Sequence, residues 1–472
     1  MLEELEAASG LLQIALDRYL RVCSAIQKSY VAKNASDTIS QDFKEKIRAE
    51  AHTLLDYESK FQEAKAAITW TRNSAALAPA GNLPPEILAQ IFRFVLCQEQ
   101  CSIQREYTYE EFRFSRYPDW LSHVCSHWRQ VALGSRELWT HIDIYPEPAV
   151  GQRINLRARA YAERSIPLPL YIHIKEFGHR IEYGGIDRLS RLLDCPATSA
   201  IGLISYLAPR ARSFNITING GYLDFYRIAL ESCLRSCRPG VLSRLVIRGA
   251  IDEDDFSMVI TARDGTLGKQ YTREPYGFIT LDITEQQLED TLFWCTSLSF
   301  DGIFTPWESK GYRGLTELRL TSYSKPRFSL QEESIPESAF VNILKGSPQL
   351  RVLLFGFRLR TPLPASTFVE PVSLPDLETL AIEEEGSSIG NLLRWVAPGT
   401  KALTVLIQWN RDLNGRGTFT IGQLEALLAR SNVRRLSVAG AYNYDLTKLS
   451  QAAYKFPELS LNSDDIDWDE LL

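Results

Sequence analysis

Apolar residues recur at helical spacing early in the chain. From Ile87 to Leu96 they fall at i, i+1, i+4, i+5, i+8 and i+9, which predicts one apolar stripe along a helix of about four turns. Asn82 is a suitable N-cap for this helix, and the prolines that follow suit its first turn. A second, shorter helix is predicted from Trp120 to Ala132. Two short helices with this much apolar surface cannot bury all of it against each other, so another part of the chain or another protein must cover the rest.

Residues 1–78 carry two more amphipathic patterns, one on each side of a polar break at 34–37. They predict two helices that form a helical hairpin or arm. Such a pair can pack against the next domain, or it can pair with a second chain. Its heptad pattern is too imperfect to favour a long coiled coil, and the small residues at 75–81 predict a linker.

The periodicity changes after residue 145. Short strand-like segments repeat a pattern in which apolar residues stand at the first, fourth and sixth positions. The clearest copies lie at 242–247, 315–320, 350–355, 377–382, 433–438 and 456–461. From residue 298 onward, the centres of successive copies are 20 to 35 residues apart. This spacing is typical of repeats that bury their apolar face by stacking on their neighbours.

Amphipathic segments such as 339–344 and 421–428 lie between these strands. The pattern therefore predicts an α/β fold over residues 145–472, with a curved parallel sheet and helices on its outer side. An ordinary doubly wound α/β sheet is the competing architecture, and the absence of a Gly-rich phosphate loop after any strand disfavours it. Residues 252–283 interrupt the pattern and predict a β-hairpin insertion with Asp264 near its turn. The insertion is either a recognition element or a solvated loop.

Four short motifs follow one another between residues 82 and 144. They are Leu83-Pro84-Pro85-Glu86-Ile87-Leu88, Ile91-Phe92, Val124-Cys125-Xaa-Xaa-Trp128-Arg129 and Leu138-Trp139. Together they resemble the F-box, and the Trp-Arg and Leu-Trp elements resemble a large fungal group of F-box-like proteins. The segment 97–119 between the two helices is longer than in a compact F-box, and we interpret it as an inserted loop.

The resemblance implies a function for the whole chain. An F-box docks a substrate receptor on a Skp-family adaptor, and through it on an SCF-type (cullin–RING) ubiquitin ligase. The residues implied for adaptor binding are Leu83, Pro84, Pro85, Ile87, Leu88, Ile91, Phe92, Val124, Cys125, Trp128 and Arg129. An irregular leucine-rich-repeat solenoid over residues 145–472 is then expected to bind an unknown target protein. Aromatic residues near its strand ends are candidate anchors for that target: Trp294, Trp307, Trp409, Tyr442 and Tyr444.

Two other interpretations stay open. In one, the F-box-like segment packs internally and the protein is a non-ligase protein-interaction scaffold. In the other, the chain is an α/β enzyme, but no nucleophile elbow, Walker loop or paired metal-ligand motif supports catalysis. We therefore expect neither enzymatic activity nor a cofactor. His123, Cys125 and His127 do not project in one direction from a helix, so no metal site is expected either.

Composition agrees with a protein-binding role. Apolar residues make up 45% of the chain and charged residues 23%, which is ordinary for a globular protein. The net charge of −6 gives no reason to expect nucleic acid or an anionic membrane as a partner. The eight cysteines show no disulfide framework, and no apolar run is long enough to span a membrane. Because the N-terminal segment is acidic where a signal peptide is basic, we expect a cytoplasmic and/or nuclear location.

Overall fold

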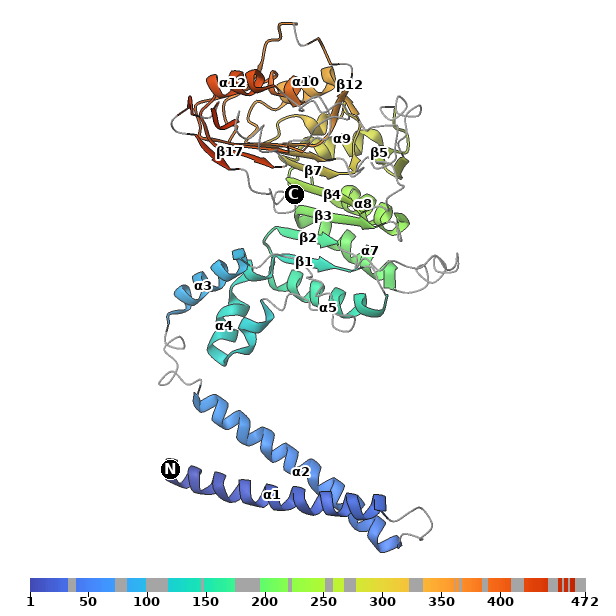
Figure 1. Ribbon diagram of the computed structural model, residues 1–472. Coiled ribbons are helices and arrows are strands. Elements are labelled where there is room, and N and C mark those ends of the chain that lie inside the picture. The colour runs from blue at the N-terminus through green and yellow to red at the C-terminus, as the bar shows by residue number, and fades with distance from the viewer. Residues whose placement is uncertain are drawn as a thin grey trace. The chain divides into compact units, whose positions relative to one another are not determined.

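The computed structural model describes most of the chain. The described residues are 1–32, 40–72, 83–98, 118–145, 148–174, 196–219, 223–250, 258–266, 277–321, 334–360, 362–364, 367–383, 389–408, 420–439, 449–451, 454–456 and 459–462. They form two compact units, Met1–Leu83 and Pro84–Leu472. Figure 1 shows the long helices of the first unit and the large sheet of the second.

The first unit consists of two long helices, α1 (Leu2–Ala32) and α2 (Gln41–Arg72). The hydroxyl of Tyr19 in α1 donates a 2.6 Å hydrogen bond to Glu50 Oε1 in α2. From this contact the helices diverge toward the N-terminus of α1 (Figure 1). No side chain of α2 is buried, and large apolar side chains of both helices are exposed. The two predicted helices are present, but they bury little of the apolar surface that they carry.

The second unit begins with short helical segments. They are α3 (Pro85–Gln98), the 3-10 turn η2 (Asp119–His123), α4 (Ser126–Gly134) and the 3-10 turn η3 (Arg136–Trp139). The prediction of one helix from Trp120 to Ala132 is wrong, because the backbone is extended at Cys125, with φ −157° and ψ 173°. The Cys125 sulfur instead caps α4 by accepting a hydrogen bond from the backbone N–H of Trp128 at 3.5 Å.

An eleven-stranded sheet runs through the second unit. Its strands are β1 (His141–Ile144), β2 (Leu170–Ile174), β3 (Ala211–Asn219), β4 (Arg244–Ala250), β7 (Ser297–Asp301), β9 (Glu317–Thr321), β11 (Val352–Phe355), β14 (Thr379–Ile382), β16 (Leu403–Gln408), β17 (Val433–Ala439) and β18 (Ser460–Asn462). All neighbouring strands are parallel, and their order in the sheet follows their order in the chain. A doubly wound sheet reverses its strand order at a switch point, and this sheet does not. The predicted combination of N-terminal helices with a large parallel α/β sheet is confirmed.

Equivalent apolar residues lie side by side across this sheet. One row, read from β1 to β17, consists of Ile142, Ile172, Phe214, Leu245, Leu298, Leu318, Leu353, Leu380, Val405 and Leu436. Every member of the row is buried, as are the members of a parallel row from Ile144 to Val438. Because successive side chains of a strand point to opposite faces, both rows lie on one face, which we call the apolar face. The residues between them form the second face.

Helices alternate with the strands along the chain. They are α5 (Pro148–Arg164), α7 (Pro196–Leu207), the 3-10 turn η4 (Ala208–Arg210), α8 (Leu223–Ser236), α9 (Glu285–Phe293), the 3-10 turn η7 (Lys310–Tyr312), α10 (Glu337–Gly346), α11 (Ile389–Leu393) and α12 (Ile421–Ala429). Phe340 of α10 packs on Phe355 of the apolar face, with ring centroids 4.7 Å apart. The core of the unit therefore lies between helices and the apolar face.

The segment at 252–283 differs from its prediction. Strand β5 (Met258–Ala262) pairs in parallel both with β6 (Gly277–Leu281) and with β8 (Ile303–Phe304). The predicted β-hairpin is therefore wrong, since a tight turn joins only antiparallel strands. Asp264, expected near the turn, instead accepts the backbone N–H of Glu285 at 2.7 Å and so satisfies the first turn of α9. Two further parallel pairs are β10 (Ser334–Pro336) with β12 (Arg358–Arg360), and β13 (Val372–Leu374) with β15 (Val396–Pro398).

Three successive helices each fasten a later loop through a buried carboxylate. Glu231 of α8 accepts the backbone N–H of Asp282 at 3.0 Å, and Glu289 of α9 accepts that of Lys310 at 2.5 Å. Glu337 of α10 accepts the N–H of Leu363 at 2.7 Å. All three glutamates are buried. A buried carboxylate is stable only with such partners, so each one fixes a loop that lies beyond the next strands of the chain.

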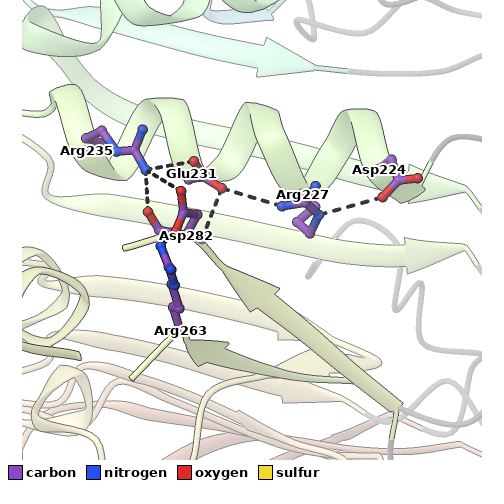
Figure 2. A network of polar contacts seen from close by, with 6 residues as sticks. All are labelled: Asp224, Arg227, Glu231, Arg235, Arg263 and Asp282. Atoms are coloured by element: carbon purple, nitrogen blue, oxygen red, sulfur yellow. Dashed lines mark hydrogen bonds and ion pairs between the residues drawn. The ribbon is translucent and has the colours of Figure 1, made fainter. Parts of the chain in front are cut away.

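Figure 2 shows the first of these carboxylates in its polar network. Glu231 lies between Arg227 and Arg235 of the same helix, with Arg235 Nη2 at 2.9 Å from Glu231 Oε1. Arg235 also donates to the backbone oxygen of Asp282, and Arg263 pairs with the Asp282 carboxylate at 2.9 Å. The network joins α8 to the ends of β5 and β6, so it anchors the three-stranded insertion on the main body of the unit.

Candidate functional site

Helix α3 has one buried and one exposed apolar side. Leu88 and Phe92 are fully buried, and the Phe92 ring packs on Trp128 of α4 with centroids 5.0 Å apart. Ile87, Ile91 and Phe94 point away from this core and are 42%, 39% and 71% exposed. These three residues stand at i, i+4 and i+7, and we call them the outer face of α3. The buried residues Leu88 and Phe92 fix the rotation of α3 about its own axis. The helix therefore presents its outer face to solvent as an apolar ridge.

The segment after α3 exposes further large apolar side chains. Trp120 and Val124 of the η2 region and Leu133 of α4 are all exposed. The residues around them are held in place by polar contacts to the backbone and between side chains. Arg129 Nε donates to the backbone oxygen of Ser122 at 2.8 Å, and Arg157 of α5 pairs with Asp119 at 2.9 Å. The exposed apolar groups are therefore carried by elements with defined tertiary contacts.

Trp139 ties this helical segment to the sheet. Its side chain is fully buried, and its indole N–H donates to the backbone oxygen of Ala132 in α4 at 2.8 Å. The ring packs edge-on against Tyr161 of α5 at 4.8 Å, and the Arg164 guanidinium lies 4.4 Å from the ring centroid. Because strand β1 starts two residues later, the position of α4 is coupled to the edge of the large sheet.

The structure separates the predicted adaptor-binding residues into three groups, which are buried, half-buried and accessible. Leu88 and Phe92 have no surface left for a partner, so we remove them from the expected contact set. Cys125 and Trp128 are half-buried and act as the cap of α4 and the packing partner of Phe92. The remaining predicted residues keep accessible surface: Leu83, Pro84, Pro85, Ile87, Ile91, Val124 and Arg129. Sequence reasoning missed Phe94, because it lies outside the stripe that defines the helix.

The predicted substrate anchors do not form one cluster among the described residues. Trp294 follows α9 and is exposed, with its ring 5.7 Å from that of Phe293. Trp307 is buried and stacks on Phe304 at 4.3 Å, so its assignment as an exposed anchor is wrong. Trp409, Tyr442 and Tyr444 lie outside the described residues. Trp294 alone of the five is thus described with an accessible surface.

Ionisable groups give no sign of an active site in the described part of the chain. Burial raises the pKa of the Cys295 thiol to about 12, which keeps it protonated and unreactive. Burial and the neighbouring His173 lower the pKa of His141 to about 4, against the effect of Asp143, so this imidazole is neutral at pH 7. Within the described ranges, no three His, Cys, Asp or Glu side chains come together as a metal-ligand set. None of the described helices is long and apolar enough to span a membrane.

No protein-family model matches this chain, and no curated protein matches it. The resemblance to the F-box therefore rests on the sequence motifs between Leu83 and Trp139. The structure adds which of these residues are buried and which are exposed.

Proposed function

We propose that this protein is a substrate-recognition adaptor of an SCF-type (cullin–RING) ubiquitin ligase. In this proposal residues 82–144 dock on a Skp-family adaptor through the outer face of α3. The observation that carries it is the exposure of Ile87, Ile91 and Phe94 on a helix whose other side is fixed in the core. Burying side chains of this size contributes about 1.5–3 kcal/mol each, which suits the centre of a stable interface.

The large sheet supports the second half of the proposal. Its strands follow the chain in order, and one buried apolar position repeats in register from β1 to β17. That arrangement is what stacked leucine-rich repeats produce, so we assign residues 145–472 as an irregular leucine-rich-repeat solenoid that binds the target. The protein performs no bond chemistry itself. It raises the effective concentration of target lysines near the conjugating enzyme that the ligase brings.

A titration with purified adaptor tests the docking site. The variant Ile87→Ser/Ile91→Ser removes two exposed apolar side chains from α3 and leaves Leu88 and Phe92 in place. We expect binding to weaken by about a hundredfold, since two interface anchors are lost, with no change in thermal stability. The control is Leu156→Ser, which removes an apolar side chain from α5 that is 65% exposed, more than either isoleucine.

The result also decides between this proposal and its alternative. Unchanged affinity in the double variant would exclude the outer face of α3 as the docking site. Failure of the unmodified protein to bind any Skp-family adaptor would favour the non-ligase scaffold, in which another segment of the chain covers that face. In that case α3 would already resist hydrogen exchange in the full chain without adaptor.

A further inference from the structure

The second face of the large sheet carries arginines around a lane of serines. Strand β7 contributes Ser297 and Ser299 to this face, and it lies between β4 and β9. In register with Ser297 are Arg244 on β4 and Glu317 on β9. In register with Ser299 is Arg319 on β9. Ser297 therefore lies between Arg244 and Glu317, and Ser299 lies between Val246 on β4 and Arg319 on β9.

Polar atoms in this lane lack partners. Ser299 is 1% exposed, and its Oγ has no hydrogen-bond partner among the described residues. The same holds for Arg319 Nε and for Asn215 Oδ1, which lies in the same row on β3. Buried polar atoms normally have partners, so two neighbouring side chains without them, Ser299 and Arg319, indicate that something else supplies them.

The charges at this position favour an anion. Burial lowers the pKa of Arg319; Glu317 opposes that effect, and the positive charges of Arg244 and Arg248 add to it. The two acidic groups nearby already accept hydrogen bonds from hydroxyls. Glu317 Oε2 accepts from Ser297 Oγ at 3.0 Å, and Asp301 Oδ1 accepts from Thr321 Oγ1 at 2.8 Å. Arg319 is thus a partly desolvated cation that an incoming negative charge would stabilise.

We call the surface formed by Arg244, Ser297, Ser299 and Arg319 the arginine lane. We propose that it binds an acidic group on an extended segment of the target protein. The inference rests on the proposed function, because it names the chemistry by which the repeat region recognises its target. Guanidinium groups bind carboxylates and phosphates in bidentate geometry, and the Ser299 hydroxyl supplies a further donor. The strands that carry the arginines are about 10 Å apart, which admits a single side chain between them.

Fluorescence anisotropy with labelled peptides tests the arginine lane. Three peptides of one length are used: one rich in glutamate, one with phosphoserine at the same positions and one with glutamine there. We expect the purified full chain to bind an acidic peptide at least about tenfold more tightly than the glutamine peptide, with the preference falling at high salt. The comparison between glutamate and phosphoserine shows which acidic group the lane prefers.

Substitutions locate the binding. Arg319→Gln and, separately, Arg244→Gln should each weaken acidic-peptide binding by about tenfold, as expected for loss of one charge-assisted contact. Arg153→Gln, on the exposed surface of α5, is the control and should change nothing. Since Arg319→Gln removes a partly desolvated charge, its thermal stability should not fall. Arg244→Gln gives an independent measurement if that expectation fails.

Two outcomes would overturn the inference: equal binding of all three peptides, or acidic-peptide binding that survives both substitutions. The peptides are titrated without adaptor, so the result is separate from docking through α3. Acidic-peptide binding without adaptor binding would uphold the arginine lane and refute the ligase role. Adaptor binding without acidic-peptide selectivity would refute the arginine lane and uphold the ligase role.

Discussion

Helices α3 and α10 share an amphipathic pattern but differ in environment. Both are short amphipathic helices with a strong apolar side. In α10 the residues Phe340, Val341, Ile343 and Leu344 are all buried. Among the side chains of α3 that the structure describes, only Leu88 and Phe92 are buried, and Ile87, Ile91 and Phe94 remain exposed.

The difference comes from what surrounds each helix. Helix α10 contacts the apolar face through Phe355, and Glu337 at its start is bonded to Arg394, Trp395 and the loop at Leu363. Among the described residues, α3 has its nearest packing partner in α4, through Trp128. An apolar pattern therefore predicts that a helix forms, but it does not tell which of its apolar residues the chain itself covers. The apolar residues that the chain leaves exposed are the ones that indicate a binding partner.

The largest expected effect is a difference in unfolding free energy between two substitutions in α3, one of a buried phenylalanine and one of an exposed phenylalanine. Phe92→Ala removes a fully buried ring and should lower the free energy of unfolding by about 3–5 kcal/mol, through lost burial and a residual cavity. Phe94→Ala removes a ring that is already in water and should change it by less than about 0.5 kcal/mol. Urea unfolding measures both, with Phe340→Ala in α10 as the buried reference. Equal costs for Phe92→Ala and Phe94→Ala would show that α3 has no outer face.

A second effect concerns the electrostatic anchoring of α10. Glu337 and Arg394 form a 2.8 Å ion pair that is almost fully removed from water. Burial raises the pKa of Glu337, but hydrogen bonds from Arg394, Trp395 and the Leu363 N–H outweigh it, and the net pKa lies below its ordinary value. Glu337→Gln leaves the Arg394 charge unpaired and should cost about 3 kcal/mol near pH 7.

The pH dependence of this cost has a defined sign. A carboxylate whose pKa is lower in the folded state stabilises the protein above its unfolded pKa of about 4.3, and this contribution is lost as the pH falls through the folded value. The stability difference between the unmodified protein and Glu337→Gln should therefore be full at pH 6–7 and shrink below about pH 4. The exposed pair of Glu163 with Arg159 supplies the control, because Glu163→Gln should show no such dependence. A constant difference from pH 7 to pH 3 would contradict the assignment.

Some of this structure was predictable because it is local or repeated. The Leu318, Leu353 and Leu380 positions recur with their motif along the chain, and they align across β9, β11 and β14. The parallel pairing of β5 with β6 was not predictable from alternation, because both pairing directions use the same period of two. The burial of a side chain was also not predictable where it depends on contacts with residues far away in the sequence. Trp307 is covered by Phe304 and Phe357, one of them fifty residues away in sequence.

The proposed docking site was predictable only as an apolar stripe along the helix. Ile87 and Leu88 are neighbours on the same apolar side of the predicted helix, and sequence spacing does not tell which of them faces the core. The ring of Trp128, which packs against the side of α3 that carries Phe92, makes that choice. The arginine lane had no sequence signal, since Arg244, Ser299 and Arg319 are far apart in the chain and meet only through strand register.

Hydrogen–deuterium exchange of the full chain, with and without a purified Skp-family adaptor, tests the docking proposal most directly. Without adaptor, we expect α3 to exchange faster than α10, because less of its side-chain surface is buried. On adding adaptor, exchange should slow across Pro85–Gln98 and stay unchanged across Glu337–Gly346. If α3 keeps its exchange rate while the adaptor is bound, docking occurs elsewhere and the proposed role of its outer face is refuted.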